Sequence, residues 1–81
     1  SPEALERASR LFRALADEAR LRLLARLAEG PACVTDLAEA EGESLPTISQ
    51  RIRVLRSEQL VTRTRDGRHV SYALADDHVL A

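Results

Sequence analysis

The spacing of apolar residues along this chain changes from helical to extended near residue 60. Before that point, apolar residues recur every three or four positions, which places them on one side of an α-helix. Serine, aspartate, glycine and proline residues interrupt this spacing at places typical of helix ends. The pattern therefore predicts four helices, at about residues 2–15, 18–29, 34–41 and 45–58.

The fourth predicted helix separates apolar from polar residues most clearly. Ile48, Ile52 and Leu55 follow the i, i+4, i+7 spacing of a single apolar stripe. Ser44 can cap the helix, and Pro46 suits its first turn. The remaining faces carry Thr47, Ser49, Gln50, Arg51, Arg53 and Arg56. This helix is therefore expected to pack by its apolar side and to present polar and basic side chains outward.

After the fourth predicted helix, apolar and polar residues alternate. Every second residue from Val70 to Leu74 is apolar, as in a strand with one buried face. The dipeptide Asp66-Gly67 just before them is a strong signal for a hairpin turn. The alternation predicts strands at about residues 61–65 and 69–74. The residues after them read as the start of a last helix, from about residue 76.

The third and fourth predicted helices are joined by a short turn that contains Gly42. Two short helices joined in this way, the second with an exposed polar face, form a helix-turn-helix. A β-hairpin directly after them adds a wing. We therefore predict a mainly α fold with one β-hairpin, a winged helix-turn-helix.

The length of the chain bears on its assembly. A chain of 81 residues forms one small domain, and a core of that size is marginal unless a partner subunit adds buried surface. We therefore expect the chain to form an oligomer. The chain begins without Met and ends at Ala81, in what reads as the first turn of another helix. We expect residues 1–81 to be a single DNA-binding domain whose C-terminal helix is truncated.

Charge is distributed unevenly along the chain. The formal net charge is −1, so the total gives no indication of a nucleic-acid partner. Residues 46–73, however, hold six arginines and two acids, whereas residues 29–45 hold five acids and no arginine. Such separation suits a surface that faces phosphate, because each phosphate that is neutralised releases counterions. The alternative interpretation is that these arginines form only a solvated face.

The polar residues of the fourth helix and of the hairpin are suited to contact duplex DNA. A glutamine can bond the edge of an adenine with two hydrogen bonds, and an arginine can do the same with guanine. Threonine and serine near a helix N-terminus can meet a phosphate or a base, and arginines beside the hairpin turn would lie at the tip of the wing. The candidate DNA contacts are Thr47, Ser49, Gln50, Arg51, Arg53, Arg65 and Arg68.

Several classes of protein are excluded by composition. A single cysteine rules out an intramolecular disulfide framework, and neither a signal peptide nor an apolar run near 18 residues is present. We therefore expect a cytoplasmic protein without a membrane partner. No nucleophile, base and orienting group occur in a recognisable constellation, so an enzyme is not expected.

Three successive segments resemble one family. The segments LFRALADEARLRLL, CVTDLAEAEGESLPTISQRIRVLR and LVTRTRDGRHVSYAL resemble, in this order, the ArsR/SmtB-type metal-responsive repressors of bacteria. The resemblance implies a homodimer built on the first and last helices, which binds a palindromic operator and releases it when metal binds. The chain departs from the family at Glu41 and Glu43, where apolar residues are usual, with Leu45 as their substitute.

The resemblance also indicates where a metal would bind. Asp76 and His78 match the family's D-x-H at the start of the last helix. Carboxylate oxygen and imidazole nitrogen would provide half of a tetrahedral site for zinc or a similar divalent metal. In the family the other half comes from the last helix of the partner subunit. The alternative is that Asp76 is only a helix cap and His78 an exposed residue.

A second metal location is suggested by Cys33 and Asp36. Many members of the family carry C-V-C-D at this position and bind arsenic or soft metals through thiolates. Thr35 replaces the second cysteine here, so an arsenic site is not expected. The alternative for Cys33 is a small buried apolar residue.

The main hypothesis is a bacterial transcriptional repressor that binds a palindromic operator as a homodimer and is released by a divalent metal ion such as zinc. Two alternatives remain open. One is a winged-helix repressor of the same fold that senses a non-metal signal or none. The other is an interaction module that does not bind DNA.

Overall fold

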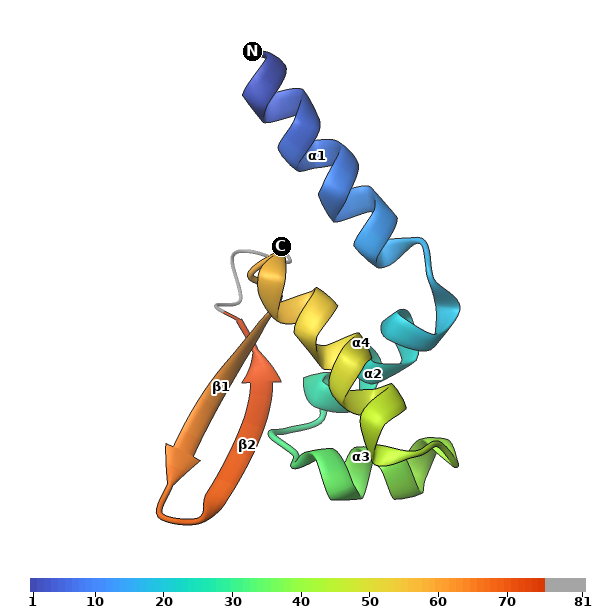
Figure 1. Cartoon of the computed structure of the whole chain (residues 1–81), viewed down its shortest axis with the longest axis vertical. Helices are drawn as coiled ribbons and strands as arrows, with labels where there is room; N and C mark the ends of the chain where they lie inside the picture. Colours follow the sequence, from blue (N-terminus) through green and yellow to red (C-terminus); the bar gives the residue numbers. More distant parts are fainter. Residues whose placement is uncertain (76–81) are drawn as a thin grey trace.

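The computed structural model describes residues 1–75, which form four helices and one antiparallel hairpin (Figure 1). The elements are α1 (Pro2–Leu15), α2 (Glu18–Ala28), α3 (Val34–Glu41), α4 (Leu45–Ser57), β1 (Val61–Asp66) and β2 (His69–Leu74). The predicted winged helix-turn-helix is confirmed, and each helix or strand end lies within one residue of its predicted position. The predicted last helix from about residue 76 lies outside the described residues.

Short polar residues define where the helices begin and end. The side chains of Ser1, Asp17 and Ser44 accept hydrogen bonds from backbone amides three residues later, at 3.2 to 3.3 Å. Each bond satisfies one amide that the helix itself leaves unpaired. Gly42 closes α3 in a left-handed conformation, with φ 66°, which glycine adopts without steric cost. Local sequence therefore determines most helix ends.

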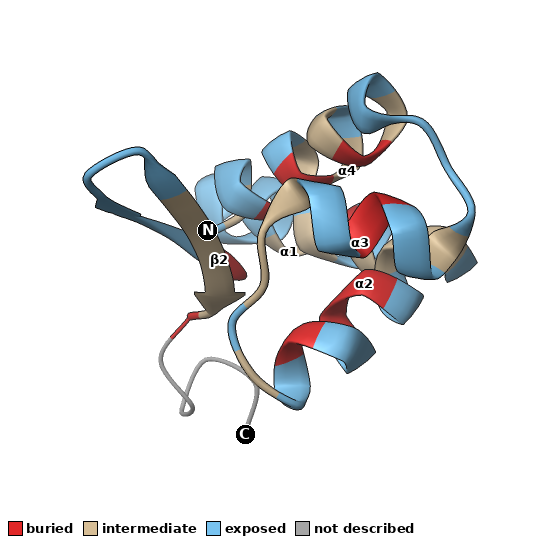
Figure 2. Ribbon diagram, turned by 90° about the horizontal axis from the view of Figure 1, so that it is seen from below, coloured by how far each residue is buried: buried red, intermediate tan, exposed pale blue. Residues whose placement is uncertain are grey.

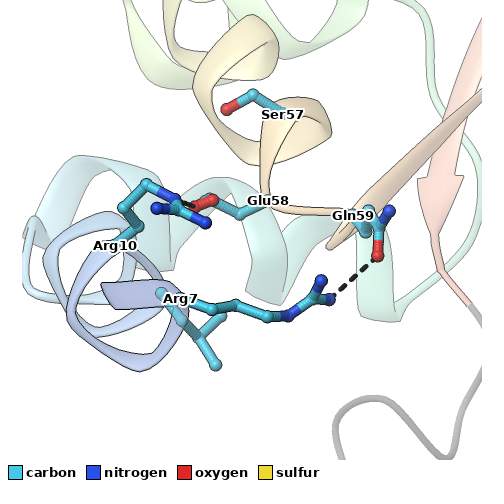
Figure 3. Close-up of a pocket in the computed structure, with 6 residues that line it drawn as sticks. Arg7, Arg10, Ser57, Glu58 and Gln59 are labelled. Carbon is cyan, nitrogen blue, oxygen red and sulfur yellow. Dashed lines mark hydrogen bonds and ion pairs between the residues drawn. The ribbon is translucent and has the colours of Figure 1, made fainter. Parts of the chain in front are cut away.

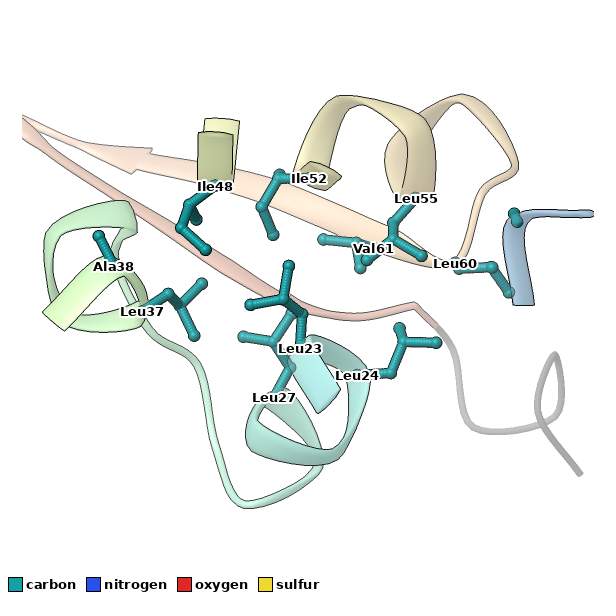
Figure 4. Close-up of a cluster of buried hydrophobic side chains, with 11 residues drawn as sticks. Leu23, Leu24, Leu27, Leu37, Ala38, Ile48, Ile52, Leu55, Leu60 and Val61 are labelled. Carbon is teal, nitrogen blue, oxygen red and sulfur yellow. The ribbon is translucent and has the colours of Figure 1, made fainter. Parts of the chain in front are cut away.

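The hydrophobic core lies between α2, α3 and α4 (Figure 2). Figure 4 shows the apolar side chains of these helices meeting one another and those at the start of the hairpin. The buried cluster consists of Ala14, Leu23, Leu24, Leu27, Leu37, Ala38, Ile48, Ile52, Leu55, Leu60 and Val61. Full burial of one such leucine or isoleucine contributes about 1.5 to 3 kcal/mol, so this cluster holds the helix-turn-helix together.

The hairpin differs from the prediction at its turn. The strands pair from Val61 opposite Leu74 to Asp66 opposite His69, so Asp66 belongs to β1. The two loop residues are therefore Gly67 and its successor, not the predicted pair Asp66-Gly67. Gly67 has φ 64°, and a glycine with positive φ at the first loop position is typical of type II′ turns. The wing is thus one residue longer on its first strand than the alternation indicated.

A third segment joins the hairpin without forming a regular strand. The amide of Ala32 donates to the carbonyl of Tyr72 at 2.9 Å, and the amide of Tyr72 donates to the carbonyl of Ala32 at 2.8 Å. The amide of Ala75 donates to the carbonyl of Leu60 at 2.9 Å and closes the base of the hairpin. These bonds fix the wing against the helices.

The first helix extends away from the other three (Figure 1). Its C-terminal half contacts the core through Ala14, which is buried, and through Leu11 and Leu15, which are half-buried. Leu5 and Phe12, by contrast, are 73% and 68% exposed. The apolar stripe of α1 is therefore largely uncovered in a single chain.

Glu41 occupies a sheltered position at the end of α3. Its side chain is only 4% exposed, and its carboxylate accepts hydrogen bonds from Arg22 Nε, at 2.9 Å, and from Arg26 Nε. Hydrogen bonds from Arg26 and Arg22 hold the pKa of Glu41 below its ordinary value of 4.5. Leu45 is half-exposed, so the expectation that it substitutes for an apolar residue here is wrong. An ion pair to α2 takes the place of apolar packing.

Candidate nucleic-acid interface

The fourth helix presents two different faces. Ile48, Ile52 and Leu55 are buried and attach it to the core, because they repeat along one side of the helix. Gln50 and Arg53 lie on the opposite side and are exposed. The packing of one side therefore holds the other in a fixed, outward orientation, as a helix entering the major groove requires.

The N-terminal turn of α4 is organised by its cap. Ser44 Oγ accepts from the amide of Thr47 at 3.3 Å and donates to Thr47 Oγ1 at 2.9 Å. Thr47 and Ser49 are both half-buried. These two candidate contacts therefore lie at the edges of the exposed face, and the hydroxyl of Thr47 already takes part in the cap.

Arg51 differs from the other basic residues of α4. It is half-buried, and its Nη2 lies 3.7 Å from Glu43 Oε1, across the turn from α3. Its Nη1 is buried without a hydrogen-bond partner within residues 1–75. Arg51 is thus held against the protein, whereas Arg53 extends into solvent.

The wing carries three further exposed arginines. Arg65 Nε donates to the carbonyl of Gly67 at 3.1 Å, so its side chain folds over the turn. Arg68 is an exposed loop residue at the tip of the wing. Arg63 lies on β1 and is also exposed. Arg63, like Arg56 on α4, was counted in the charge of this segment but was not among the candidate contacts. Both side chains are exposed in the structure, and the sequence pattern alone did not distinguish them from the other arginines of the segment.

The arginines of α2 differ in their partners from those of α4 and the wing. All those of α2 form ion pairs within the fold, with Asp17, Glu18 or Glu41. Of the six arginines between residues 46 and 73, only Arg51 forms an ion pair within residues 1–75. The others in that range have no carboxylate partner among residues 1–75: Arg53, Arg56, Arg63, Arg65 and Arg68. Within residues 1–75 no carboxylate pairs with them, so their guanidinium groups can meet phosphate.

The candidate metal ligands are not assembled in the described residues. Asp76 and His78 lie outside them. Cys33 precedes α3 and lines a hollow beside the wing, whereas Asp36 lines a different hollow between α2 and α3. No group of three or more His, Cys, Asp or Glu side chains that could hold a metal ion occurs within residues 1–75. The described part of the chain therefore supplies at most two ligands at Cys33 and Asp36, and they face different hollows.

No helix of the described residues is both long enough and apolar enough to span a membrane.

Comparison with known proteins places the chain among bacterial regulators. The family model described as "Bacterial regulatory protein, arsR family" matches residues 17–63. A transcriptional repressor SmtB homolog of Synechocystis is 45% identical over 99% of this chain. The transcriptional regulator NmtR of Mycobacterium tuberculosis is 43% identical over 95% of it. The chain spans 61% and 64% of the lengths of these two relatives.

A solved structure resembles the fold closely. It is the homodimeric winged helix-turn-helix DNA-binding domain of a possible ArsR-family transcriptional regulator from Mycobacterium bovis. The two chains superpose with a TM-score of 0.92 at 34% identity, over 98% of this chain and 73% of the other.

Proposed function

Because the chain belongs to the ArsR family of bacterial regulatory proteins, we propose that it is a transcriptional repressor that binds duplex DNA as a homodimer. The family is one of regulators and not of enzymes. The observation that carries the proposal is the group of exposed arginines on α4 and the wing that have no carboxylate partner within residues 1–75.

The partners of the arginines set α4 and the wing apart from α2. The arginines of α2 pair with carboxylates, whereas five of the six between residues 46 and 73 have no carboxylate partner within residues 1–75 and lie together on α4 and the wing. Each uncompensated arginine that reaches a phosphate releases a counterion and raises affinity. This contrast also favours a repressor over an interaction module that has lost DNA binding.

The exposed side of α4 and the tip of the wing have different roles in this proposal. Gln50 and Arg53 read base edges in the major groove, because they lie opposite the buried stripe. Arg65 and Arg68 contact the backbone or the minor groove from the wing, independently of sequence. Arg51, held by Glu43, serves mainly to position the helix.

The first helix provides the surface for a second subunit. Leu5 and Phe12 are exposed on it, and their burial against another copy would contribute about 1.5 to 3 kcal/mol for each side chain. The related domain from Mycobacterium bovis is homodimeric. A symmetric dimer presents two recognition helices, which fit half-sites about 34 Å apart in successive major grooves.

Selection of duplexes from a random pool would test this proposal. We expect enrichment of an inverted repeat whose half-sites are about one helical turn apart, because two symmetric subunits read the same sequence in opposite orientations. Lack of any enrichment would contradict sequence-specific DNA binding, and enrichment of a single half-site would contradict the dimer.

We further propose that a divalent metal ion such as zinc releases the DNA. The support is the match of Asp76 and His78 to the D-x-H of the family that the sequence resembles. A metal at these residues, shared with the partner subunit, would supply bonds that hold the two subunits at one angle. DNA must then weaken metal binding by the same factor as metal weakens DNA binding.

Zinc titration of the protein and of His78→Ala, each with and without the selected duplex, distinguishes the alternatives. Loss of zinc affinity in His78→Ala, with reciprocal coupling to DNA in the unaltered protein, is expected. Equal zinc affinity in both proteins would reject the site. Tight zinc binding with unchanged DNA affinity would instead favour a repressor that senses another signal.

A further inference from the structure

Two arginines of α1 reach the C-terminal end of the recognition helix α4 (Figure 3). Arg7 Nη2 donates to Gln59 Oε1 at 2.9 Å. Arg10 Nε lies 3.5 Å from Glu58 Oε1. The two arginines are three residues apart and therefore project from the same side of α1. We call these four residues the α1–α4 latch.

Glu58 is sheltered for a charged residue that ends a helix. Its side chain is 13% exposed, and its Oε1 accepts no hydrogen bond within residues 1–75. A carboxylate withdrawn from water in this way needs a nearby positive charge to compensate for the lost solvation. Arg10 provides that charge, so Glu58 favours a position of α1 that keeps the guanidinium close.

Gln59 is fixed by the backbone that ends α4. Its φ is 61°, and it is the only residue other than glycine with positive φ among residues 1–75. Its amide donates to the carbonyl of Arg56 at 2.9 Å, and the amide of Leu60 donates to that of Leu55 at 3.0 Å. These bonds close the helix end and hold the residue that receives Arg7.

The rest of α1 is weakly attached. Ala14 is its only buried residue, and it lies in the last turn. The turns that carry Arg7 and Arg10 touch the body of the domain through the latch and through Leu11, which lines the same small hollow of 130 Å³. Together with the packing of the last turn of α1, the latch holds the angle between α1 and α4.

We propose that the α1–α4 latch transmits the geometry of the dimer to the recognition helix. The inference rests on the proposed function, in which Leu5 and Phe12 of α1 contact the second subunit. Since α1 is fixed in the dimer and the latch fixes α4 to α1, the latch sets the separation of the two recognition helices. Arg7, Arg10, Glu58 and Gln59 are positioning residues, and they need not touch DNA.

Loss of the latch should affect DNA binding differently from a general loss of folding. Binding to a palindrome requires the correct separation of two recognition helices, whereas binding to an isolated half-site requires only one of them. Loss of the latch should therefore weaken binding to the palindrome and leave half-site binding nearly unchanged. It should also relax the preference for one spacing between half-sites.

The test compares Arg10→Glu, Glu58→Arg and the double charge swap on palindromic and half-site duplexes by fluorescence anisotropy. Each single reversal should weaken palindrome binding about tenfold, which is typical of coupling between distant sites, and the swap should restore most of it. Half-site affinity should stay within about twofold of the original, because one recognition helix is enough. Arg13→Glu, on an exposed part of α1, is the control for the added negative charge.

Two less disruptive variants test whether a loss of DNA affinity comes from misfolding. Arg7→Ala and Arg10→Gln keep the helix intact, and their thermal unfolding and dimer mass are measured beside the DNA affinities. Equal losses on both duplexes, no loss on either, or no recovery in the charge swap would overturn the latch. If the unaltered protein binds neither duplex, the proposed function fails and the latch fails with it; if it binds the palindrome and the variants bind equally well, the latch alone fails.

Discussion

At the scale of single residues, arginine has two different roles in this chain. In α2, arginines pair with carboxylates of the fold, whereas those of α4 and the wing, except for Arg51, have no carboxylate partner within residues 1–75. The helix, strand or loop that carries each of these arginines was predicted correctly from the sequence. The sequence could not distinguish Arg51 from Arg53, because the difference depends on Glu43 approaching across the turn after α3.

Replacing Gln50 with Ala should relax discrimination at one base pair of the operator. The glutamine amide can bond an adenine edge bidentately, and one such contact discriminates by about 1 to 3 kcal/mol. Anisotropy titrations with the selected duplex and with duplexes altered at single positions would measure this. Identical losses on the selected and on scrambled duplexes would show that Gln50 does not read a base.

At the scale of elements, the ends of helices and strands were predictable because capping residues and periodicity are local properties. The turn of the hairpin was placed one residue early. The dipeptide Asp66-Gly67 is typical of a type I′ turn, whereas the structure has Gly67 at the first loop position, as in a type II′ turn. The bridge between Ala32 and Tyr72 was not predicted, because one pair of residues has no periodicity. The ion pairs of Glu41 with Arg22 and Arg26, which we call the Glu41 clamp, were also not predicted, because the arginines lie on another helix.

Replacing Glu41 with Gln should destabilise the fold by about 1 to 2 kcal/mol near neutral pH, because charge-assisted hydrogen bonds to α2 are weakened. The arginines stay partly exposed and can turn to water, which limits the loss. Denaturant unfolding would measure it. Glu39→Gln, at an exposed position of the same helix, is the matched control.

The same variant should change the pH dependence of stability. The pKa of Glu41 is lower in the folded protein than its ordinary value of 4.5, because Arg26 and Arg22 donate to the carboxylate. Its contribution is therefore fully present above that value and is lost as the pH falls through the lower, folded pKa. Unfolding series from pH 7 to pH 3 should be flatter at the acidic end for Glu41→Gln. Equal slopes for the variant and the unaltered protein would contradict the clamp.

At the scale of the whole molecule, α1 extends from the domain and leaves large apolar side chains exposed in a single chain. The length of the chain indicated a partner subunit, and the exposure of Leu5 and Phe12 on α1 agrees with that prediction. The metal site could not be assembled from the sequence in the same way. Its proposed ligands Asp76 and His78 lie outside the described residues, and the rest of such a site would come from another chain.

Replacing Phe12 with Glu should convert a dimer into monomers, because a charge would be buried where an apolar ring is expected. Sedimentation should give twice the chain mass of 9.0 kDa for the unaltered protein and the single mass for the variant. Leu21→Glu, at another exposed apolar position on α2, should remain a dimer. An unaltered protein that stays monomeric at micromolar concentration would contradict assembly through α1.

The central claim is that the uncompensated arginines of α4 and the wing bind duplex DNA. The salt dependence of affinity tests it most directly, because its slope counts the phosphates that the protein neutralises. In a comparison of the unaltered protein with Arg68→Ala and Arg13→Ala, the slope should become shallower by about one unit for each phosphate contact that Arg68→Ala removes. Arg13→Ala, which alters an α1 arginine hydrogen-bonded to Ser9, should leave the slope unchanged. Equal slopes for Arg68→Ala and the unaltered protein, or a change in Arg13→Ala of the same size, would contradict the assignment of the DNA surface.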